Sequence, residues 1–553
     1  MTWSAAPSPP VCASSSDRTA MTLPLRRRFH GLLRQAVLPA FGLLALAVAA
    51  CQGKPEDQKT SAETAAPASN GAVADGSIAQ LFGTNCAGCH GVDLKGAQGP
   101  SLVDKTWIHG SDDASILKII TKGAMTAGMP AFEGRFSDSE MRGLVAYIRE
   151  KGASAPADTA PFPTSTQTSE KQAYKVVPVV AKGLVTPWSM VFLGADRMLV
   201  SERPGRLRVV HTDGTIDAPV ANAPRITSEF IHGGMLGLAL APDYAKSGWI
   251  YIAFTDERPD RFDEIERCGK RSTCFQLASQ IKVIRAKLRG NALVEKQTIW
   301  QAPDRSYRTT PNFGGRMAFG ADGMLYFGVG DRVYSLMEAQ DLSSPIGKVH
   351  RVAPDGSIPK DNPFAKKPGA LASIWSYGHR NPQGFAVDPR TGHLWETEHG
   401  PRGGDELNLL HPGSNYGWPL VTLGMGYDGL PFDPAYPIGH SQLAVPMPKA
   451  AKPDPSTMVD SVTHWTPSIA VSSIAFYTGN LFPQWRNSLF VTSLQQQEFL
   501  RLTITNDKVT GQELLFRWHG RLRDVVNGPD GAIYIAVNEP DMIVKLVPAT
   551  EKR

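Results

Sequence analysis

The sequence predicts a large all-β domain, a six-bladed β-propeller, with a small all-α domain on its N-terminal side. Short strand-like runs separated by Gly, Asp and Pro turns recur through residues 174–548. Ahead of them, an amphipathic helical pattern at residues 137–151 follows a paired-cysteine motif. With 42% hydrophobic and 20% charged residues, the composition is that of an ordinary globular protein whose length allows two or three domains.

The propeller prediction depends on a repeated unit: a turn, an apolar strand and a strand of small residues. Four runs show it most clearly, at residues 197–202, 249–254, 324–329 and 532–537. Units spaced at roughly fifty residues indicate a radial array, and each run is typical of the inner strands of a blade. The length favours six blades over seven or eight, and a pair of β-sandwiches is the alternative.

The paired cysteines lie in the motif Cys86-Ala87-Gly88-Cys89-His90. Two thiols at this spacing with a histidine directly after them are the attachment motif of c-type haem. Cys86 and Cys89 are expected to form thioethers with the haem vinyl groups, and His90 is expected to bind the iron from one face. A chance pair or a metal-binding pair is the alternative.

A second iron ligand is expected from Met129, which lies in a Gly-Met-Pro sequence about forty residues after the histidine. Met125 is its competitor. A thioether opposite histidine raises the reduction potential of the haem, which suits an electron acceptor. Residues 76–152 resemble a class I cytochrome c domain, and this is the small all-α domain of the prediction.

The N-terminus predicts export and a lipid anchor. Three arginines at residues 26–28 precede an apolar run at residues 36–50, which ends in small residues before Cys51. This order is typical of an export signal over residues 1–51 and resembles a lipoprotein cleavage site. The expected location is periplasmic, with lipid on Cys51. A plain cleaved signal and a retained anchor are the alternatives.

Two segments predict flexible connections. Residues 52–75 are rich in Ala, Lys, Glu and Ser, and predict a tether between the lipid and the haem domain. Residues 153–173, in which Pro, Thr, Ser and Ala dominate, predict a linker that lets the haem domain move. Cys268 and Cys274 remain, and in an exported protein they either close a short disulfide loop or stay as two free thiols.

The charge of the chain gives no case for nucleic-acid binding. The formal net charge is +5, and residues 1–50 hold five arginines and one aspartate, so removing that segment takes away +4 and leaves +1. A nucleic-acid-binding protein would carry a basic patch on its folded domains.

Three ordered motifs in the large domain, at residues 378–384, 398–406 and 415–419, are too long to be explained by turns alone. With them, residues 174–548 resemble the soluble quinoprotein aldose and glucose/sorbosone dehydrogenases. Members of that family are six-bladed propellers that hold pyrroloquinoline quinone (PQQ) with calcium in a central cleft. The resemblance implies oxidation of a sugar or a related alcohol or aldehyde.

The resemblance also implies which residues hold PQQ. Arg521 and Arg523 match the arginine pair that binds the carboxylates of the cofactor, which suits the forked guanidinium group. Arg380 and Asn381 match residues that contact the quinone, with Arg380 near the reacting carbonyl. Ser468 aligns with a hydroxyl contact, although the spacing around it differs by one residue.

Calcium ligands follow from the same resemblance. The backbone carbonyls of Gly400 and Pro401 match the family's calcium ligands, and carbonyl oxygens are hard ligands that suit this ion. Asp405 and Tyr416 are expected nearby, acting through water.

Two departures from the family concern catalysis. The general-base histidine of the family corresponds to Asn312, and an amide cannot accept the proton of a sugar hydroxyl. Asp331 matches the acid that orients this histidine, so it is expected to have lost its partner. His232 stands where the family has a glutamine facing the same hydroxyl, and it is suited to act as the base at physiological pH. The alternative is that His232 only packs or bonds locally and the site is inactive.

A third departure concerns cofactor affinity. Gln495 stands where the family usually places a lysine against the cofactor, so weaker PQQ binding is expected unless Arg501 or another residue offsets the loss.

The sequence supports two interpretations of function. In the first, a sugar is oxidised at PQQ, and electrons pass to the fused haem and then to a periplasmic or membrane acceptor. In the second, the propeller has lost PQQ catalysis and binds a glycan or protein beside a working cytochrome. The fused haem favours the first interpretation, whereas Asn312 and Gln495 favour the second.

Overall fold

A computed structural model of the chain describes residues 75–96, 100–103, 112–124, 129–154, 161–226, 233–262, 277–308, 310–333, 335–424, 426, 432–435, 454–466 and 468–549. Several sequence-based expectations concern residues outside these ranges and stay predictions: the export signal with Cys51, the tether, Met125, His232, Cys268 and Cys274. Among the described residues, no helix combines the length and apolar character needed to cross a membrane.

The N-terminal domain is helical, as predicted. Its elements are α1 (Asp75–Asn85), α2 (Ala87–His90), α3 (Asp113–Lys122) and α4 (Asp138–Ser154). The start of α4 is a capping box, because the Ser137 amide donates to Glu140 Oε2 at 2.8 Å while Ser137 Oγ accepts from the Glu140 amide at 3.2 Å. The apolar faces of these helices enclose a small core of Ile78, Phe82, Leu94, Ile116, Ile120, Phe132, Met141, Leu144, Val145 and Ile148.

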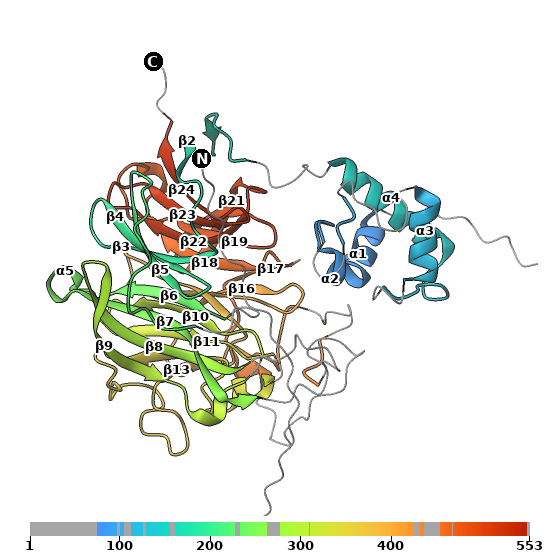
Figure 1. The fold of residues 1–553 in the computed structure, drawn as a ribbon. Helices are drawn as coiled ribbons and strands as arrows, with labels where there is room; N and C mark the ends of the chain where they lie inside the picture. Colours follow the sequence, from blue (N-terminus) through green and yellow to red (C-terminus); the bar gives the residue numbers. More distant parts are fainter. Residues whose placement is uncertain are drawn as a thin grey trace, which may run out of the picture. The chain divides into compact units, whose positions relative to one another are not determined.

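Within the described residues, the large domain consists of six antiparallel sheets, and the predicted six-bladed propeller is confirmed (Figure 1). One three-stranded blade contains β3 (Pro187–Phe192), β4 (Arg197–Glu202) and β5 (Arg206–His211). The next blade has four strands, β6 (Met235–Leu240), β7 (Trp249–Phe262), β8 (Leu277–Arg289) and β9 (Ala292–Gln301). The blade after it has β10 (Gly314–Phe319), β11 (Leu325–Val329), β12 (Lys348–Val352) and β13 (Ile374–Tyr377). The fourth blade contains β14 (Pro382–Val387), β15 (Leu394–Glu398), β16 (Asp405–Leu409) and β17 (Thr463–Trp465). The fifth contains β18 (Val471–Phe476), β19 (Leu489–Ser493), β20 (Phe499–Thr505) and β21 (Lys508–Phe516).

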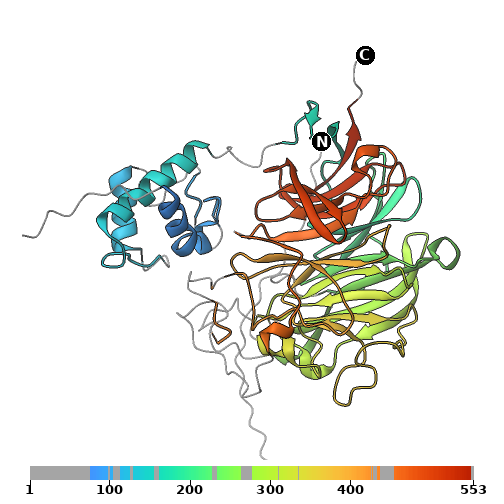
Figure 2. The same cartoon turned by 180° about the vertical axis from the view of Figure 1, so that it is seen from behind.

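The sixth blade closes the ring with strands from both ends of the domain. Its strands are β22 (Arg521–Asn527), β23 (Ile533–Asn538), β24 (Met542–Pro548), β2 (Ala173–Val180) and β1 (Gln167–Thr168). Strand β2 pairs antiparallel with β24, from Tyr174 opposite Pro548 to Val180 opposite Ile543. Figures 1 and 2 both show this early strand beside the last ones. Pairing strands from the two ends of the domain in one blade closes the ring.

The repeated runs recognised in the sequence are the second strands of their blades. They correspond to β4, β7, β11 and β23, each paired on its inner side with a first strand. These second strands are almost fully buried because sheets from the neighbouring blades cover both of their faces. A strand buried on both faces has a continuous apolar sequence, which explains why these runs stood out.

The linker is shorter than expected. Residues 161–173 are attached to the propeller instead of forming part of a free connection. The ring of Phe162 packs edge-on against Phe516, with centroids 5.5 Å apart, and β1 pairs with β2. The Glu170 amide also donates to Glu513 at 2.5 Å. An aromatic residue inside a Pro- and Thr-rich segment provides the apolar contact that composition alone did not reveal.

A buried ion pair joins four blades at the propeller axis. Arg316 on β10 donates through Nη1 to Asp524 Oδ1 on β22 at 2.8 Å, and the two side chains are only 5% and 3% exposed. Arg316 also donates through Nε to the Gln383 carbonyl on β14 at 3.0 Å, and its guanidinium lies 4.2 Å from the ring centroid of Trp188 on β3. The second oxygen of Asp524 accepts from the Met190 amide at 2.7 Å.

We expect Asp524→Asn to lower the free energy of unfolding by about 3–5 kcal/mol, because it leaves the buried Arg316 charge without its counter-ion. The measurement is urea denaturation followed by tryptophan fluorescence. Asp361→Asn is the matched control, since Asp361 also pairs with an arginine, Arg351 at 3.0 Å, but its side chain is 73% exposed. We expect the control to unfold like the wild type. Equal destabilisation by the two variants would contradict the assigned importance of the axial pair.

Candidate active site

A cavity of about 760 Å³ opens at one end of the propeller axis. Its wall is built from the beginnings of first strands, such as Trp188 and Arg521, and from residues that follow second strands, such as Arg203 and Gln495. Because first and second strands are antiparallel, these positions meet at the same end of every blade. The topology therefore gathers residues that are distant in the sequence around one hollow.

Four of the residues predicted to hold the cofactor line this cavity: Asn381, Gln495, Arg521 and Arg523. Arg380 and Asn312 lie beside the wall, with 8% and 6% of their surfaces exposed. Ser468 is not part of the wall, because its hydroxyl is bonded to both oxygens of Asp405 at 2.8 Å. A direct contact between Ser468 and a quinone stays a prediction, and this geometry does not support it.

Three arginines lie on the cavity wall: Arg203, Arg521 and Arg523. Burial, and then the charges of Arg521, Arg316 and Arg203, lower the pKa of Arg523 well below its usual value. Arg523 has one weak side-chain bond, from Nε to Asn538 Oδ1 at 3.4 Å. Two carboxylates also line the wall, Glu539 and Asp541, and Asp541 accepts from the Thr186 amide at 2.8 Å. Guanidinium groups without carboxylate partners fit the carboxylates of PQQ.

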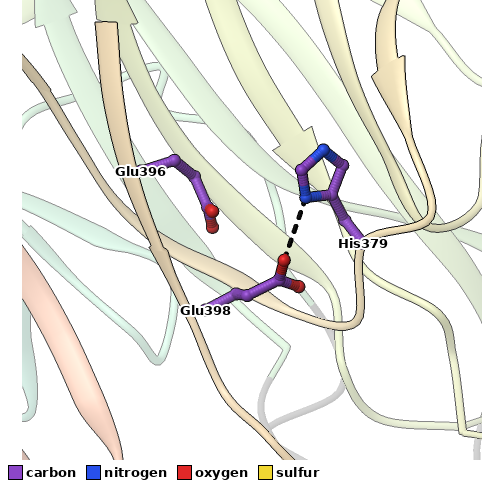
Figure 3. Close-up of side chains that lie close together, drawn as sticks. All are labelled: His379, Glu396 and Glu398. Atoms are coloured by element: carbon purple, nitrogen blue, oxygen red, sulfur yellow. Dashed lines mark hydrogen bonds and ion pairs between the residues drawn. The ribbon is translucent and has the colours of Figure 1, made fainter. Parts of the chain in front are cut away.

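A buried carboxylate orients the segment that carries Arg380 and Asn381. Glu398, at the end of β15, accepts hydrogen bonds from the backbone amides of both residues, at 3.3 Å from Asn381. Its other oxygen accepts from His379 Nδ1 at 3.0 Å (Figure 3). The guanidinium of Arg380 donates to the His399 carbonyl at 3.2 Å and lies 5.3 Å from the ring centroid of Trp418.

His379, Glu396 and Glu398 form a buried group whose ligand-type atoms lie within 4.8 Å of one another (Figure 3). We assign it to positioning and not to metal binding. Both imidazole nitrogens are engaged, Nδ1 with Glu398 and Nε2 with the Ser376 hydroxyl at 2.8 Å. The Asn408 amide donates to Glu396 and Glu398 at 3.2 and 3.1 Å. Burial, and then the neighbouring Glu398 charge, raises the pKa of Glu396 well above its usual value, which favours its neutral form.

Asp331 has a complete set of partners, so the expectation that it lost its partner is wrong. Asn312 Nδ2 donates to Asp331 Oδ1 at 2.9 Å, and the Trp418 indole donates to Oδ2 at 2.9 Å. The Val333 amide adds a third bond at 2.9 Å. An asparagine amide supplies the N–H that an imidazole would supply, so the acid keeps its role of orienting residue 312. Burial raises the pKa of Asp331.

His399 also lines the cavity, and it is a neutral hydrogen-bonding group. Its Nε2 donates to the Val471 carbonyl at 2.7 Å, which leaves Nδ1 to accept from Asn381 Nδ2 at 3.4 Å. Burial, and then the Arg380 charge, lowers the pKa of His399 to about 3. A base this weak, with both nitrogens engaged, is not suited to accept the proton of a sugar hydroxyl.

The loop expected to bind calcium has free oxygen ligands. The carbonyl oxygens of Gly400 and Pro401 accept no hydrogen bond from any residue that the structure describes. Asp405 holds the loop by accepting from the Gly400 amide at 3.0 Å. The loop is tight, since a Cβ on Gly400 would lie 2.1 Å from the Gly403 carbonyl oxygen. These free carbonyls fit a calcium ion.

Tyr416 borders a hollow of about 10 Å³ together with Gly400, which by its volume is room for about one water. The Tyr416 hydroxyl, however, donates to the Leu409 carbonyl at 2.6 Å and accepts from the His411 amide at 2.9 Å. Its ring stacks on His379, with centroids 4.7 Å apart. The water-mediated role of Tyr416 therefore stays a prediction, and these bonds count against it.

The haem-binding residues of the helical domain fit covalent haem. Cys86 precedes α2, which ends at His90, and His90 is 7% exposed. Its Nδ1 donates to the Pro100 carbonyl at 2.8 Å, which fixes the tautomer and leaves the lone pair of Nε2 suited to bind iron. Met129 packs at the edge of the core that α1, α3 and α4 share.

Most residues of the cavity wall were not predicted from the sequence, among them Trp188, Arg203, Gln383 and His399. A signal for two of them was present. Arg203 directly follows the second strand β4, and His399 directly follows β15, so both occupy the same position in their blades. Once the repeats are aligned, the residue after each second strand is a candidate for the central cavity.

Comparisons with known proteins agree with this architecture. The family model described as glucose/sorbosone dehydrogenase matches residues 184–545. The model described as cytochrome c oxidase, cbb3-type, subunit III matches residues 74–148.

Three relatives illustrate the similarity of the propeller. The aldose sugar dehydrogenase YliI of Escherichia coli is 35% identical over 369 residues, which cover 66% of this chain and 90% of that protein. Quinoprotein glucose dehydrogenase B of Acinetobacter calcoaceticus is 27% identical over 421 residues, covering 65% and 84%. The PQQ-bound structure of an aldose sugar dehydrogenase from Streptomyces coelicolor superposes with a TM-score of 0.50 at 27% identity, covering 70% of this chain and 99% of that one. The chain therefore belongs to the glucose/sorbosone dehydrogenase family, with a cytochrome c domain fused to the N-terminal side of its propeller.

Proposed function

We propose that this protein is a quinohaemoprotein dehydrogenase, which oxidises a sugar or a related alcohol or aldehyde and delivers the electrons to its own c-type haem. The observation that carries the proposal is the cavity with Arg203, Arg521 and Arg523 on its wall, in a chain that also has a haem-binding motif. When bound, PQQ supplies a quinone that takes two electrons from the oxidised carbon. A redox propeller joined to a one-electron carrier has an acceptor within its own chain.

The residues around the cavity have separate tasks in this proposal. Arg521 and Arg523 bind carboxylates, and Arg380 and Asn381 are held by Glu398 to contact the quinone. The free carbonyls of Gly400 and Pro401 are the proposed calcium ligands. Trp418 and Asp331 fix the orientation of Asn312.

The base that accepts the substrate proton is proposed to be His232. Among the described residues, the candidates near the altered position are unsuitable, since Asn312 is an amide and His399 is a neutral donor with a pKa of about 3. Gly233, the next residue after His232, lies beside the cavity wall, because a Cβ there would be 3.3 Å from the Phe313 ring. The imidazole of a histidine with an ordinary pKa is suited to this step.

The expected location completes the proposal. The export signal and a lipid on Cys51 would place the enzyme in the periplasm at a membrane, where its haem would meet a periplasmic or membrane acceptor. Covalent haem and PQQ are both consistent with this location.

The deciding experiment follows haem reduction in the purified holo-cytochrome protein after addition of PQQ, calcium and a panel of aldoses. We expect reduction that requires both the sugar and PQQ, read from the visible absorption bands of the reduced haem. A Cys86→Ala/Cys89→Ala variant, which cannot attach haem, is the control: with an external dye as acceptor it should still oxidise the sugar. If the wild-type protein binds PQQ but its haem stays oxidised, the proposed electron path is wrong. If PQQ does not bind, the glycan- or protein-binding interpretation gains support.

The base assignment predicts that His232→Ala lowers kcat by about 10²- to 10⁴-fold, the usual contribution of a general base, while PQQ affinity stays near the wild-type value. The matched variant is His232→Ala combined with Asn312→His, which puts an imidazole beside Asp331. Partial recovery of kcat in the double variant is expected. Full turnover in His232→Ala would exclude the assignment.

The iron ligand is testable independently of the propeller. We expect Met129→Leu to remove the sixth ligand, converting the haem iron to a high-spin form and lowering its reduction potential, because thioether ligation favours the reduced iron. Met125→Leu is the control and should leave the spectrum and the potential unchanged. The measurements are absorption spectroscopy and redox titration. The opposite pattern would assign the ligand to Met125.

A further inference from the structure

Three arginines from distant parts of the chain face one cavity, and none of them forms an ion pair with a carboxylate that the structure describes. Arg203 follows β4, and Arg521 and Arg523 lie on β22 of the neighbouring, ring-closing blade. Among the residues that the structure describes, the guanidinium groups of Arg203 and Arg521 make no hydrogen bond and no ion pair. The buried guanidinium of Arg316, by contrast, is paired with Asp524, and that of Arg332 donates to backbone carbonyls, one of them the Ser279 carbonyl at 2.6 Å. Unpaired guanidinium groups on one wall indicate an anion-binding surface.

The backbone of Arg203 is held firmly. Its amide donates to the Thr186 carbonyl at 3.0 Å, and its carbonyl accepts from the Met235 amide at 3.0 Å. Gly234 packs directly against it, since a Cβ on Gly234 would lie 2.0 Å from the Arg203 carbonyl oxygen and 2.9 Å from its Cγ. The bonds that hold the residue are therefore backbone bonds, and an alanine at this position would keep them.

The side chain at position 495 is a neutral amide on the same wall. Arg501, expected to offset this missing charge, does not do so. It is 2% exposed and bonds to Glu513 at 2.7 Å and to Glu170 at 3.2 Å. Its charge is already neutralised at the outer side of its blade, so that expectation is wrong. Arg203 has no such partner in the described part of the chain, and its charge is close enough to Arg523 to contribute to the lowered pKa of that residue.

We propose that Arg203 binds a carboxylate of PQQ and supplies the cation that Gln495 does not provide. Arg203, Arg521 and Arg523 then form one binding site for the carboxylates of the cofactor. This inference rests on the proposed function, because it names a further residue for the cofactor of that site. A carboxylate of the substrate would bind Arg203 by the same chemistry as a carboxylate of the cofactor. The experiment distinguishes these two sources of the carboxylate.

The test is titration of the calcium-loaded, full-length protein with PQQ, followed by quenching of tryptophan fluorescence and by calorimetry. We expect Arg203→Ala to weaken PQQ binding by about 10- to 100-fold, the effect of losing one charge-assisted hydrogen bond. Arg203→Lys should recover part of the affinity, because lysine keeps the charge but not the fork. Gln495→Lys in the Arg203→Ala background should recover affinity by adding a cation to the same wall.

Two controls make the result specific. Arg197→Ala removes an equal charge from an exposed position at the start of β4, and PQQ affinity should not change. The trimethyl ester of PQQ has no carboxylate charge, so wild-type protein and Arg203→Ala should bind it with equal affinity. Thermal unfolding of each variant without PQQ confirms that the propeller has folded.

The outcomes are distinguishable. If the wild-type protein binds no PQQ, the proposed function fails. If it binds PQQ and Arg203→Ala binds equally well, the Arg203 assignment is overturned and the proposed function stands. Unchanged PQQ affinity combined with a raised KM for acidic sugars alone would instead assign Arg203 to the substrate, which also overturns the proposal.

Discussion

The ion pair between Arg316 and Asp524 connects the central fold to the cavity. It crosses the propeller axis from β10 to β22, and Arg316 also bonds to the Arg523 carbonyl at 3.1 Å. The backbone of Arg523, one of the cavity arginines, is thus held by the same guanidinium that joins the blades. Burying two charges is unfavourable unless each finds several partners. Arg316 meets this condition with Asp524, two backbone carbonyls and the face of Trp188.

The same design recurs around the cavity, where buried carboxylates fix the backbone of the segments that carry the site residues. Glu398 accepts from the amides of Arg380 and Asn381, and Asp405 accepts from the amide of Gly400. Each carboxylate lies on or next to a strand of one blade, so its position is set by the sheet. A site whose supporting groups are satisfied within the protein does not need to rearrange when a ligand binds, and this preorganisation lowers the cost of binding.

Much of this structure could be predicted from the sequence, for identifiable reasons. The run at residues 197–202 coincides with β4 because a strand buried on both faces has an uninterrupted apolar sequence. Asn381, Arg521 and Arg523 were found from the resemblance to the quinoprotein dehydrogenase family, and they line the cavity. Arg203 was not found, because it lies outside the three ordered motifs and reaches the wall through its place after β4, which ring closure brings beside β22. The partner of Asp331 was also missed, because Asn312 lacks the proton acceptor of an imidazole but keeps an amide donor.

The charge of the cavity bears on whether the protein has lost its cofactor site together with the catalytic base that Asn312 replaces. The alteration at Asn312 lies on the side held by Asp331 and Trp418, whereas the arginines belong to β22 and to the turn after β4. Unpaired, partly desolvated charges lower the stability of the folded state. An anion that binds only the native state raises this stability, and the gain grows with the logarithm of the anion concentration. A neutral glycan would leave the three guanidinium groups without an ionic partner. The electrostatics of the cavity therefore favour an anionic occupant, and they do so independently of which residue accepts the substrate proton.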